Sequence, residues 1–139
     1  MKISARNQLK GTVANVAEGA VNGVVTIALG ENTIKAGITM ESIKELGLEA
    51  GKEAYAIIKA TNVMFATGKI AGISARNQLA GTVVSVKEGA VNGHVTIELA
   101  DGNRVSGSIT NEAIESLGLA EGKEAVAVIK ATDVIVGVE

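Results

Sequence analysis

The 139-residue chain contains no cysteine, proline or tryptophan, and its aromatic residues are Tyr55 and Phe65. The lack of cysteine excludes a disulfide scaffold, a thiolate metal site and a cysteine nucleophile. Basic and acidic side chains nearly balance, 13 against 15, and the formal net charge is -2. No global charge therefore draws the protein to nucleic acid or to an anionic membrane, and any bound anion must be held by local groups.

Long apolar segments are also missing. The longest runs, such as residues 54–58, have about five residues, against the roughly 20 that span a bilayer. Residues 1–7 do not have the pattern of a signal peptide. Because hydrophobic residues still make up 47% of the chain, it can bury a core. We therefore expect a soluble, cytoplasmic protein with no membrane partner.

The sequence is one unit written twice. Residues 3–9, ISARNQL, recur as residues 73–79, and one residue is inserted in the second copy near Gly102. We predict two modules, residues 1–68 and 73–139. A unit of about 60 residues buries only around 60% of its unfolded surface. We therefore expect the modules to pack on each other and the chain to self-associate.

Alternating apolar and polar residues predict the strands of each module. In residues 3–13 the alternation has a period of two, which places Ser4 and Arg6 on the same face of the first predicted strand. Four further strands are expected in each module. The last is short, residues 63–65 or 134–136, and is expected to close its own unit.

A short helix is predicted between the third and fourth strands. Thr39 and Thr110 are suitable N-cap residues, and Gly47 and Gly118 stand where a C-terminal glycine ends a helix after about two turns. Five short strands and one helix per module predict a mainly β fold, consisting of two OB-like five-stranded barrels with one short helix each.

No catalytic set of residues is evident. The single histidine, His94, has Val24 as its counterpart in the first copy, so no repeated Ser-His-Asp arrangement exists. Carboxylates are scattered, which supports neither a metal-cation site nor paired acid and base catalysis. We expect a protein that is not an enzyme and that uses no organic cofactor.

A set of hydrogen-bond donors does recur. It could converge on one concave spot and consists of Ser4, Arg6, Thr39, Ser42 and Lys59. Hydroxyls, two cations and the N–H groups of a helix start, with no carboxylate nearby, suit an unprotonated oxyanion. Structural explanations stand beside this one: Thr39 as a cap, Arg6 in a surface ion pair, and Lys59 extending from the barrel rim. The residues alone indicate a duplicated small barrel with a candidate oxyanion site.

The order of the motifs resembles the molbindin family. Ser-Ala-Arg-Asn is followed by Gly-Thr-Val, Glu-Gly-Ala-Val-Asn-Gly, a Thr-x-x-Ser helix start and Ile-Lys-Ala-Thr, over nearly the whole chain, twice. The chain thus resembles a tandem molbindin, a cytoplasmic molybdate-binding protein. The resemblance implies OB-like barrels, a homotrimer and oxyanion sites between modules. It also implies non-enzymatic binding, storage and buffering of molybdate, and of tungstate, for molybdenum cofactor synthesis.

The resemblance further implies which residues form the sites. Oxyanion-binding residues at interfaces are expected to be Ser4, Ala5, Arg6, Thr39, Ser42 and Lys59, with Ser74, Ala75, Arg76, Thr110 and Lys130 as the second set. Ala113 replaces Ser42 in the second copy, so one hydroxyl donor is lost there and the two classes of site are expected to differ in affinity. A second type of site, near the threefold axis, is expected to use backbone N–H groups of Gly19, Ala20, Val21, Asn22, Gly89, Ala90, Val91 and Asn92.

Selectivity over sulfate is expected from cavity size, and selectivity over phosphate from a shortage of acceptors for a P–OH proton. Two alternatives are a structural oligomerisation module and a partner that delivers molybdate to an enzyme. A third is an OB-type binder of single-stranded nucleic acid. The two aromatic residues and the negative net charge disfavour this last alternative, because such proteins combine a basic groove with stacking aromatics.

Overall fold

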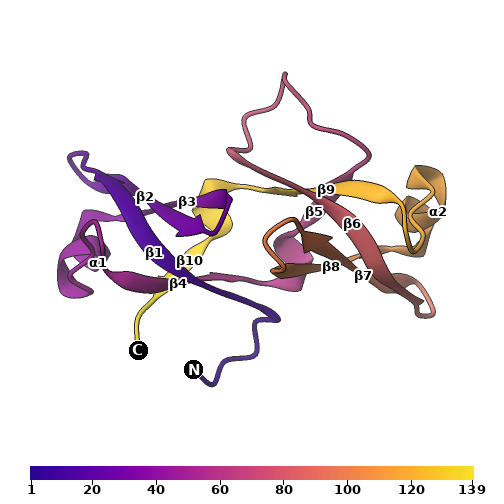
Figure 1. Ribbon diagram of the computed structural model, residues 1–139, viewed down its shortest axis with the longest axis horizontal. Coiled ribbons are helices and arrows are strands. Elements are labelled where there is room, and N and C mark those ends of the chain that lie inside the picture. The colour runs from indigo at the N-terminus through magenta and orange to yellow at the C-terminus, as the bar shows by residue number, and fades with distance from the viewer.

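The structure, a computed structural model, describes residues 1–139 and consists of two curled five-stranded sheets with one short helix each (Figure 1). The first repeat contains β1 (Asn7–Ala17), β2 (Asn22–Leu29), β3 (Asn32–Thr39), α1 (Met40–Glu45), β4 (Glu53–Ile58), the 3-10 turn η1 (Ala60–Asn62) and β5 (Met64–Ala66). The second contains β6 (Asn77–Glu88), β7 (Asn92–Leu99), β8 (Arg104–Thr110), α2 (Asn111–Leu117), β9 (Glu124–Ile129), η2 (Ala131–Asp133) and β10 (Ile135–Gly137). The predicted mainly β, OB-like class with one helix per repeat is confirmed.

The first strand is shorter at its start than the sequence pattern predicts. Strand β1 begins at Asn7, and residues 3–6 form an irregular segment before it. The reason is the neighbouring strand: β1 pairs with β4 only up to Asn7 opposite Ile58, where β4 ends. The prediction that Ser4 and Arg6 lie on the same face of a strand is therefore wrong, because neither residue belongs to a strand.

The helix boundaries follow the predicted caps. The Thr39 hydroxyl accepts the N–H of Ser42 at 3.1 Å, and the Thr110 hydroxyl accepts the N–H of Ala113 at the same distance. Gly118 ends α2 with a φ of 65°, the left-handed conformation that glycine adopts without strain. With 6 and 7 residues, neither helix is long and apolar enough to cross a membrane.

The last strand of each repeat joins the sheet of the other repeat. The strand orders are β10-β4-β1-β2-β3 and β5-β9-β6-β7-β8. Figure 1 shows β10 beside β4 and β5 beside β9. In these pairings Ile135 lies opposite Ile57, and Met64 lies opposite Val128. The prediction that each last strand closes its own unit is therefore wrong. The 3-10 turns η1 and η2 carry the chain across to the other sheet instead of back along β4 or β9.

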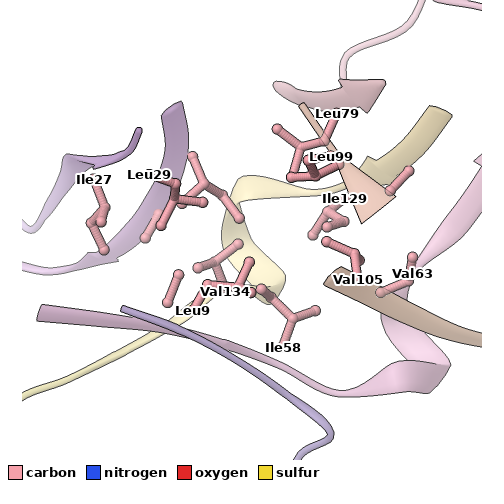
Figure 2. Close-up of a cluster of buried hydrophobic side chains, with 14 of the residues drawn as sticks. Leu9, Ile27, Leu29, Ile58, Val63, Leu79, Leu99, Val105, Ile129 and Val134 are labelled. Atoms are coloured by element: carbon pink, nitrogen blue, oxygen red, sulfur yellow. The ribbon is translucent and has the colours of Figure 1, made fainter. Parts of the chain in front are cut away.

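This strand exchange gives the two repeats one shared core. A single cluster of 28 buried apolar residues contains side chains from both repeats. Figure 2 shows Val134 among first-repeat side chains such as Leu9 and Ile58, and Val63 near Val105 of the second repeat. Burying such a side chain contributes about 1.5–3 kcal/mol. The expectation that two small modules pack on each other is confirmed.

Two buried asparagines tie each repeat to an edge strand of the other. Asn7 and Asn77 are each 2% exposed. The Asn7 amide donates to the Ser106 carbonyl and accepts the Ser106 N–H, both at 2.8 Å. Asn77 makes the same pair of bonds with Lys35, at 2.8 and 2.7 Å. Each asparagine thereby satisfies backbone groups of β8 or β3 that have no further strand beside them.

The two repeats also meet at their β-hairpin turns. Asn32 donates to the Asp101 carboxylate at 3.1 Å, and the Asn103 N–H donates to the same carboxylate at 2.9 Å. Burial alone raises the pKa of Asp101, but the hydrogen bonds from Asn32 and Asn103 outweigh it and hold the pKa below its ordinary value. The Asp101 carboxylate is therefore a link between the repeats in its charged form.

Candidate functional site

A cavity of about 300 Å³ lies at the end of the first sheet and contains four of the predicted site residues. Arg6 directly precedes β1 and Lys59 directly follows β4, and these two strands are paired up to those ends. The two cationic residues therefore leave the sheet side by side. Ser4 and Ala5 line the same cavity, so the irregular segment before β1 brings Ser4 beside Arg6 although it is not a strand.

The cationic groups of the site have no carboxylate partner. The three ion pairs of the chain join the N-terminus to Glu139, Lys10 to Glu53, and Arg104 to Glu98. None of them includes Arg6, Lys59, Arg76 or Lys130. The structural explanation of Arg6 as a member of a surface ion pair is therefore wrong.

The arginines are oriented by their own local backbone. The Arg6 Nε donates to the Ser4 carbonyl at 3.1 Å, and the Arg76 Nε donates to the Ser74 carbonyl at 3.3 Å. These are the only hydrogen bonds of either guanidinium within the chain, so the terminal nitrogens remain available. Each arginine is thus held by a bond to an uncharged backbone carbonyl, which leaves its positive charge unneutralised.

The other walls of the cavity carry no acidic side chain. They are formed by Ile3, Ala60, Thr61 and Ile135. No group of three or more His, Asp or Glu side chains anywhere in the chain is placed to hold a metal cation. The cavity thus has the charge and donor chemistry of an anion site.

Thr39 and Ser42 line a different cavity, also of about 300 Å³. Ile135 of β10 borders both cavities. The donors that the sequence suggested could converge on one spot are therefore divided within a single chain: Ser4, Arg6 and Lys59 line one cavity, and Thr39 and Ser42 line the other.

The hydroxyls at the two helix starts are arranged differently. Thr39 donates to the Ser42 Oγ at 2.9 Å, so the free hydroxyl proton belongs to Ser42. Thr110 faces Ala113, which has no hydroxyl, and its own proton remains free. Each helix start therefore has one free hydroxyl proton. It belongs to Ser42 in the first repeat and, because of Ala113, to Thr110 in the second.

Backbone N–H groups at the helix starts are largely engaged within the chain. Met40 N–H donates to the Val21 carbonyl at 2.8 Å, and Asn111 N–H donates to the Val91 carbonyl at 2.8 Å. The N–H of Ser42 is bonded to its cap. The expected contribution of free helix N–H groups is therefore smaller than the sequence suggested, and the free hydroxyl protons add to it.

The second set of site residues occupies equivalent positions. Arg76 directly precedes β6 and Lys130 directly follows β9. Ser74 and Ala75 stand before Arg76 as Ser4 and Ala5 stand before Arg6, and Thr110 caps α2.

The two predicted hairpin sites are exposed turns between β1 and β2 and between β6 and β7. Their residues are Gly19, Ala20, Val21 and Asn22, and Gly89, Ala90, Val91 and Asn92. In the second turn the Gly89 N–H donates to the Asn92 carbonyl at 2.9 Å. One of the N–H groups expected to bind an anion is therefore used to form the turn itself.

Sequence reasoning missed the asparagines and the exchanged strand. Asn7 lies on the same alternating face as the buried Leu9 and Val13, so a polar residue at an apolar position, repeated at Asn77, was a usable signal. No sequence signal identified Ile135 as a wall beside Arg6, because its place depends on which sheet β10 joins.

Two segments, residues 3–65 and 73–136, match the family model for the TOBE domain. These segments make up most of the chain, so the chain belongs to the TOBE domain family and contains two copies of the domain. The molbindin-like resemblance seen in the motifs is confirmed.

Named relatives agree with the family. The chain is 42% identical over 139 residues to the molybdenum transport protein ModE of Azotobacter vinelandii, with 99% of the chain and 52% of that protein covered. A probable molybdenum-pterin-binding protein of Haemophilus influenzae is 57% identical over 65 residues, 46% of the chain and 94% of that protein. The chain thus spans about half the length of the ModE relative, whereas the small relative corresponds to one repeat.

A solved structure matches the whole chain. It is that of the cytoplasmic molybdate-binding protein ModG with molybdate bound, at a TM-score of 0.95 and 48% sequence identity, covering 100% of both chains. The arrangement of both repeats, and not only the fold of one, is therefore shared with ModG.

Proposed function

We propose that this chain is a non-enzymatic binder of molybdate, and of tungstate, that stores and buffers the oxyanion in the cytoplasm. The observation that carries the proposal is the cavity where Arg6 and Lys59 meet with no carboxylate to neutralise them. The match to ModG, whose structure contains molybdate and which is cytoplasmic, supports both the ligand and the compartment.

The donor set fits the chemistry of molybdate. Molybdate is a tetrahedral dianion that carries no proton near neutral pH, so it needs donors and no acceptors. Each charge-assisted hydrogen bond contributes about 1.5–3 kcal/mol, and several together offset the removal of water from a dianion. Phosphate carries at least one proton at the same pH, and the cavity has no carboxylate to accept it. Cavity size would then distinguish molybdate from the smaller sulfate.

The complete site is proposed to form between copies of the chain. The hydroxyls of Thr39 and Ser42 line a cavity of their own, so a second copy can bring them to the Arg6 and Lys59 of the first. Large apolar side chains exposed in the single chain, such as Ile3 and Val21, suit burial in a homotrimer. The hairpin turns at residues 19–22 and 89–92 remain the proposed second type of site.

Equilibrium dialysis of the chain against molybdate, sulfate and phosphate tests this proposal. We expect the wild-type protein to retain molybdate in preference to the other two anions. Replacing Arg6 and Arg76 by alanine removes the guanidinium from both interfacial sites and is expected to weaken them strongly. Arg104→Ala is the matched control, because Arg104 is paired with Glu98 and lines neither cavity.

Two results contradict the proposal. Equal affinity for sulfate and molybdate rejects the stated selectivity. Unchanged molybdate affinity and stoichiometry in the double arginine variant rejects the assignment of the site residues.

A further inference from the structure

We infer that Ile135, which β10 carries over from the second repeat, forms an apolar wall of the first repeat's oxyanion site and sets its selectivity against protonated anions. Met64 of β5 takes the same position in the second repeat. The inference rests on the proposed oxyanion binding and adds a specificity-determining residue to it. It also makes each site incomplete without the last strand of the other repeat.

The position of Ile135 follows from the strand exchange. Ile135 pairs with Ile57 on β4, two residues before Lys59, and it borders both the cationic cavity and the cavity of Thr39 and Ser42. A ligand held by Arg6 and Lys59 in the cationic cavity therefore lies next to this side chain, whichever copy supplies the hydroxyls.

Ile135 is unusually exposed for its size and surroundings. It is 49% exposed, and Ile3 on the same cavity is 42% exposed, although both lie beside two unpaired cationic residues. Apolar neighbours would not help water to solvate Arg6 and Lys59 if these cations had no ligand. A desolvated anion site does benefit from them, because removing water on one side strengthens the attraction between the cations and the anion.

The wall also discriminates between anions. An isoleucine side chain has no lone pair, so it cannot accept the proton of a P–OH group. A protonated phosphate placed against Ile135 would leave that donor unsatisfied, whereas molybdate has no donor to satisfy. The apolar wall thus adds a penalty for protonated phosphate that molybdate does not incur.

In the second repeat the position of Ile135 is taken by the more flexible side chain of Met64. Met64 is 44% exposed and pairs with Val128 as Ile135 pairs with Ile57. Methionine is unbranched and has more rotatable bonds than isoleucine, so it fixes the shape of a cavity less well. We therefore expect the site of Arg6 to reject phosphate more strongly than the site of Arg76.

The test isolates one site at a time in the full-length chain. Arg76→Ala leaves the first site as the strong interfacial site, and Ile135→Thr is then added to this parent. Threonine keeps the β-branched shape and adds a hydroxyl that can accept a proton. By calorimetry we expect phosphate to become a better competitor by on the order of tenfold, because the new hydroxyl can accept the P–OH proton. Molybdate affinity is expected to change less, because the hydroxyl that replaces the apolar contact can donate to the anion. Val24→Thr, at an exposed position on β2 where the second repeat has His94, is the matched control and is expected to match the parent.

The reciprocal experiment uses Arg6→Ala as the parent and adds Met64→Thr. Phosphate is expected to become a better competitor there too, by a smaller factor than in the Ile135→Thr variant. Ile135→Val in the first parent keeps the wall apolar and is expected to keep phosphate rejection even if the threonine variant fails to fold, which thermal unfolding would reveal.

The outcomes separate the inference from the proposed function. Molybdate and phosphate binding of Ile135→Thr equal to that of its parent overturns the inference, as does a gain of phosphate binding in Ile135→Val. A wild-type chain that binds no molybdate overturns the proposed function and the inference together. If the wild-type chain binds molybdate and Ile135→Thr lets phosphate compete better than in its parent, both the proposed function and the inference are supported.

Discussion

At the scale of the residue, the site consists of charges without partners and hydroxyls with free protons. Arg6 is held by the Ser4 carbonyl, and Lys59 has no acidic neighbour. The free hydroxyl is that of Ser42 in the first repeat and that of Thr110 in the second. The same number of donors is therefore reached by two different hydrogen-bond patterns.

This pattern predicts that Ser42→Ala has a small effect. Without the Ser42 hydroxyl, the proton of Thr39 becomes free, as that of Thr110 already is beside Ala113. Molybdate affinity measured by calorimetry is expected to stay within a few-fold of wild type. Thr39→Ala is expected to cost about 1 kcal/mol of stability because it removes the N-cap, and to bind more weakly because the uncapped helix start no longer holds the Ser42 hydroxyl in place.

Thr39→Ser is the control for that pair of variants, since serine keeps both the hydroxyl and the cap. A loss of molybdate affinity in Ser42→Ala as large as that in Thr39→Ala would contradict this description of the hydroxyls.

Much of the residue-level site was accessible from the sequence. The caps at Thr39 and Thr110 follow from local patterns that the structure retains. The meeting of Arg6 and Lys59 was a hypothesis from the sequence, and it depends on the long-range pairing of β1 with β4. The direction of the Thr39 hydroxyl was not accessible, because it depends on the rotamers of two neighbouring side chains.

At the scale of the element, each exchanged strand is fitted to the sheet that receives it. The Phe65 ring of β5 packs against Gly107 of β8, where a Cβ would lie 2.9 Å from the ring Cζ. In the other sheet Val136 takes the position of Phe65 and Ala36 takes the position of Gly107. The side chain on the exchanged strand is thus smaller there, and its neighbour on the edge strand is larger. The ring of Phe65 therefore suits the second sheet, and the methyl of Ala36 disfavours its return to the first.

Gly107→Ala is expected to destabilise the fold by about 1–3 kcal/mol, because the added methyl overlaps the Phe65 ring. Adding Phe65→Val to this variant recreates the Val136–Ala36 combination and is expected to recover part of the loss. Gly37→Ala is the control on β3, where the nearest atom to a Cβ is 3.6 Å away. Chemical denaturation of the wild type, the single variants Gly107→Ala and Phe65→Val, and the double variant measures the coupling. Strictly additive effects of the two changes would show that the ring and the glycine are not matched.

The hairpin contact at Asp101 predicts a pH dependence. The pKa of Asp101 is lowered in the fold from its ordinary 3.8, so its charged form is favoured by folding. The stabilisation is present above the ordinary pKa and is lost as the pH falls through the lowered pKa of the folded state. Thermal unfolding of wild type and Asp101→Ala should differ at neutral pH and converge in acid. A difference that persists or grows on acidification would contradict this role.

Strands and helices were largely predictable because their signals are local. The alternation in residues 7–13, the threonine caps and the positive φ of Gly118 all reflect nearby residues. The exchange of β5 and β10 was not predictable, since a strand that closes its own sheet and one that crosses to the other have the same apolar pattern. Matching side chains such as Phe65 and Gly107 decide between them only once both sheets are known.

At the scale of the whole molecule, the strand exchange makes the two repeats one folding unit with one core. It also places second-repeat residues beside the first repeat's cations. The single chain presents two half-sites that both border Ile135. One contains the two cations and Ser4, and the other contains Thr39 and Ser42. We propose that self-association joins half-sites from different copies.

The most direct test is a crystal grown with molybdate, with the molybdenum located by its anomalous scattering. We predict a peak between Arg6 and Lys59 of one copy and the Thr39 and Ser42 hydroxyls of a neighbouring copy, with Ile135 against it. The absence of a peak at this interface, or a molybdenum atom enclosed by one chain alone, would contradict the account.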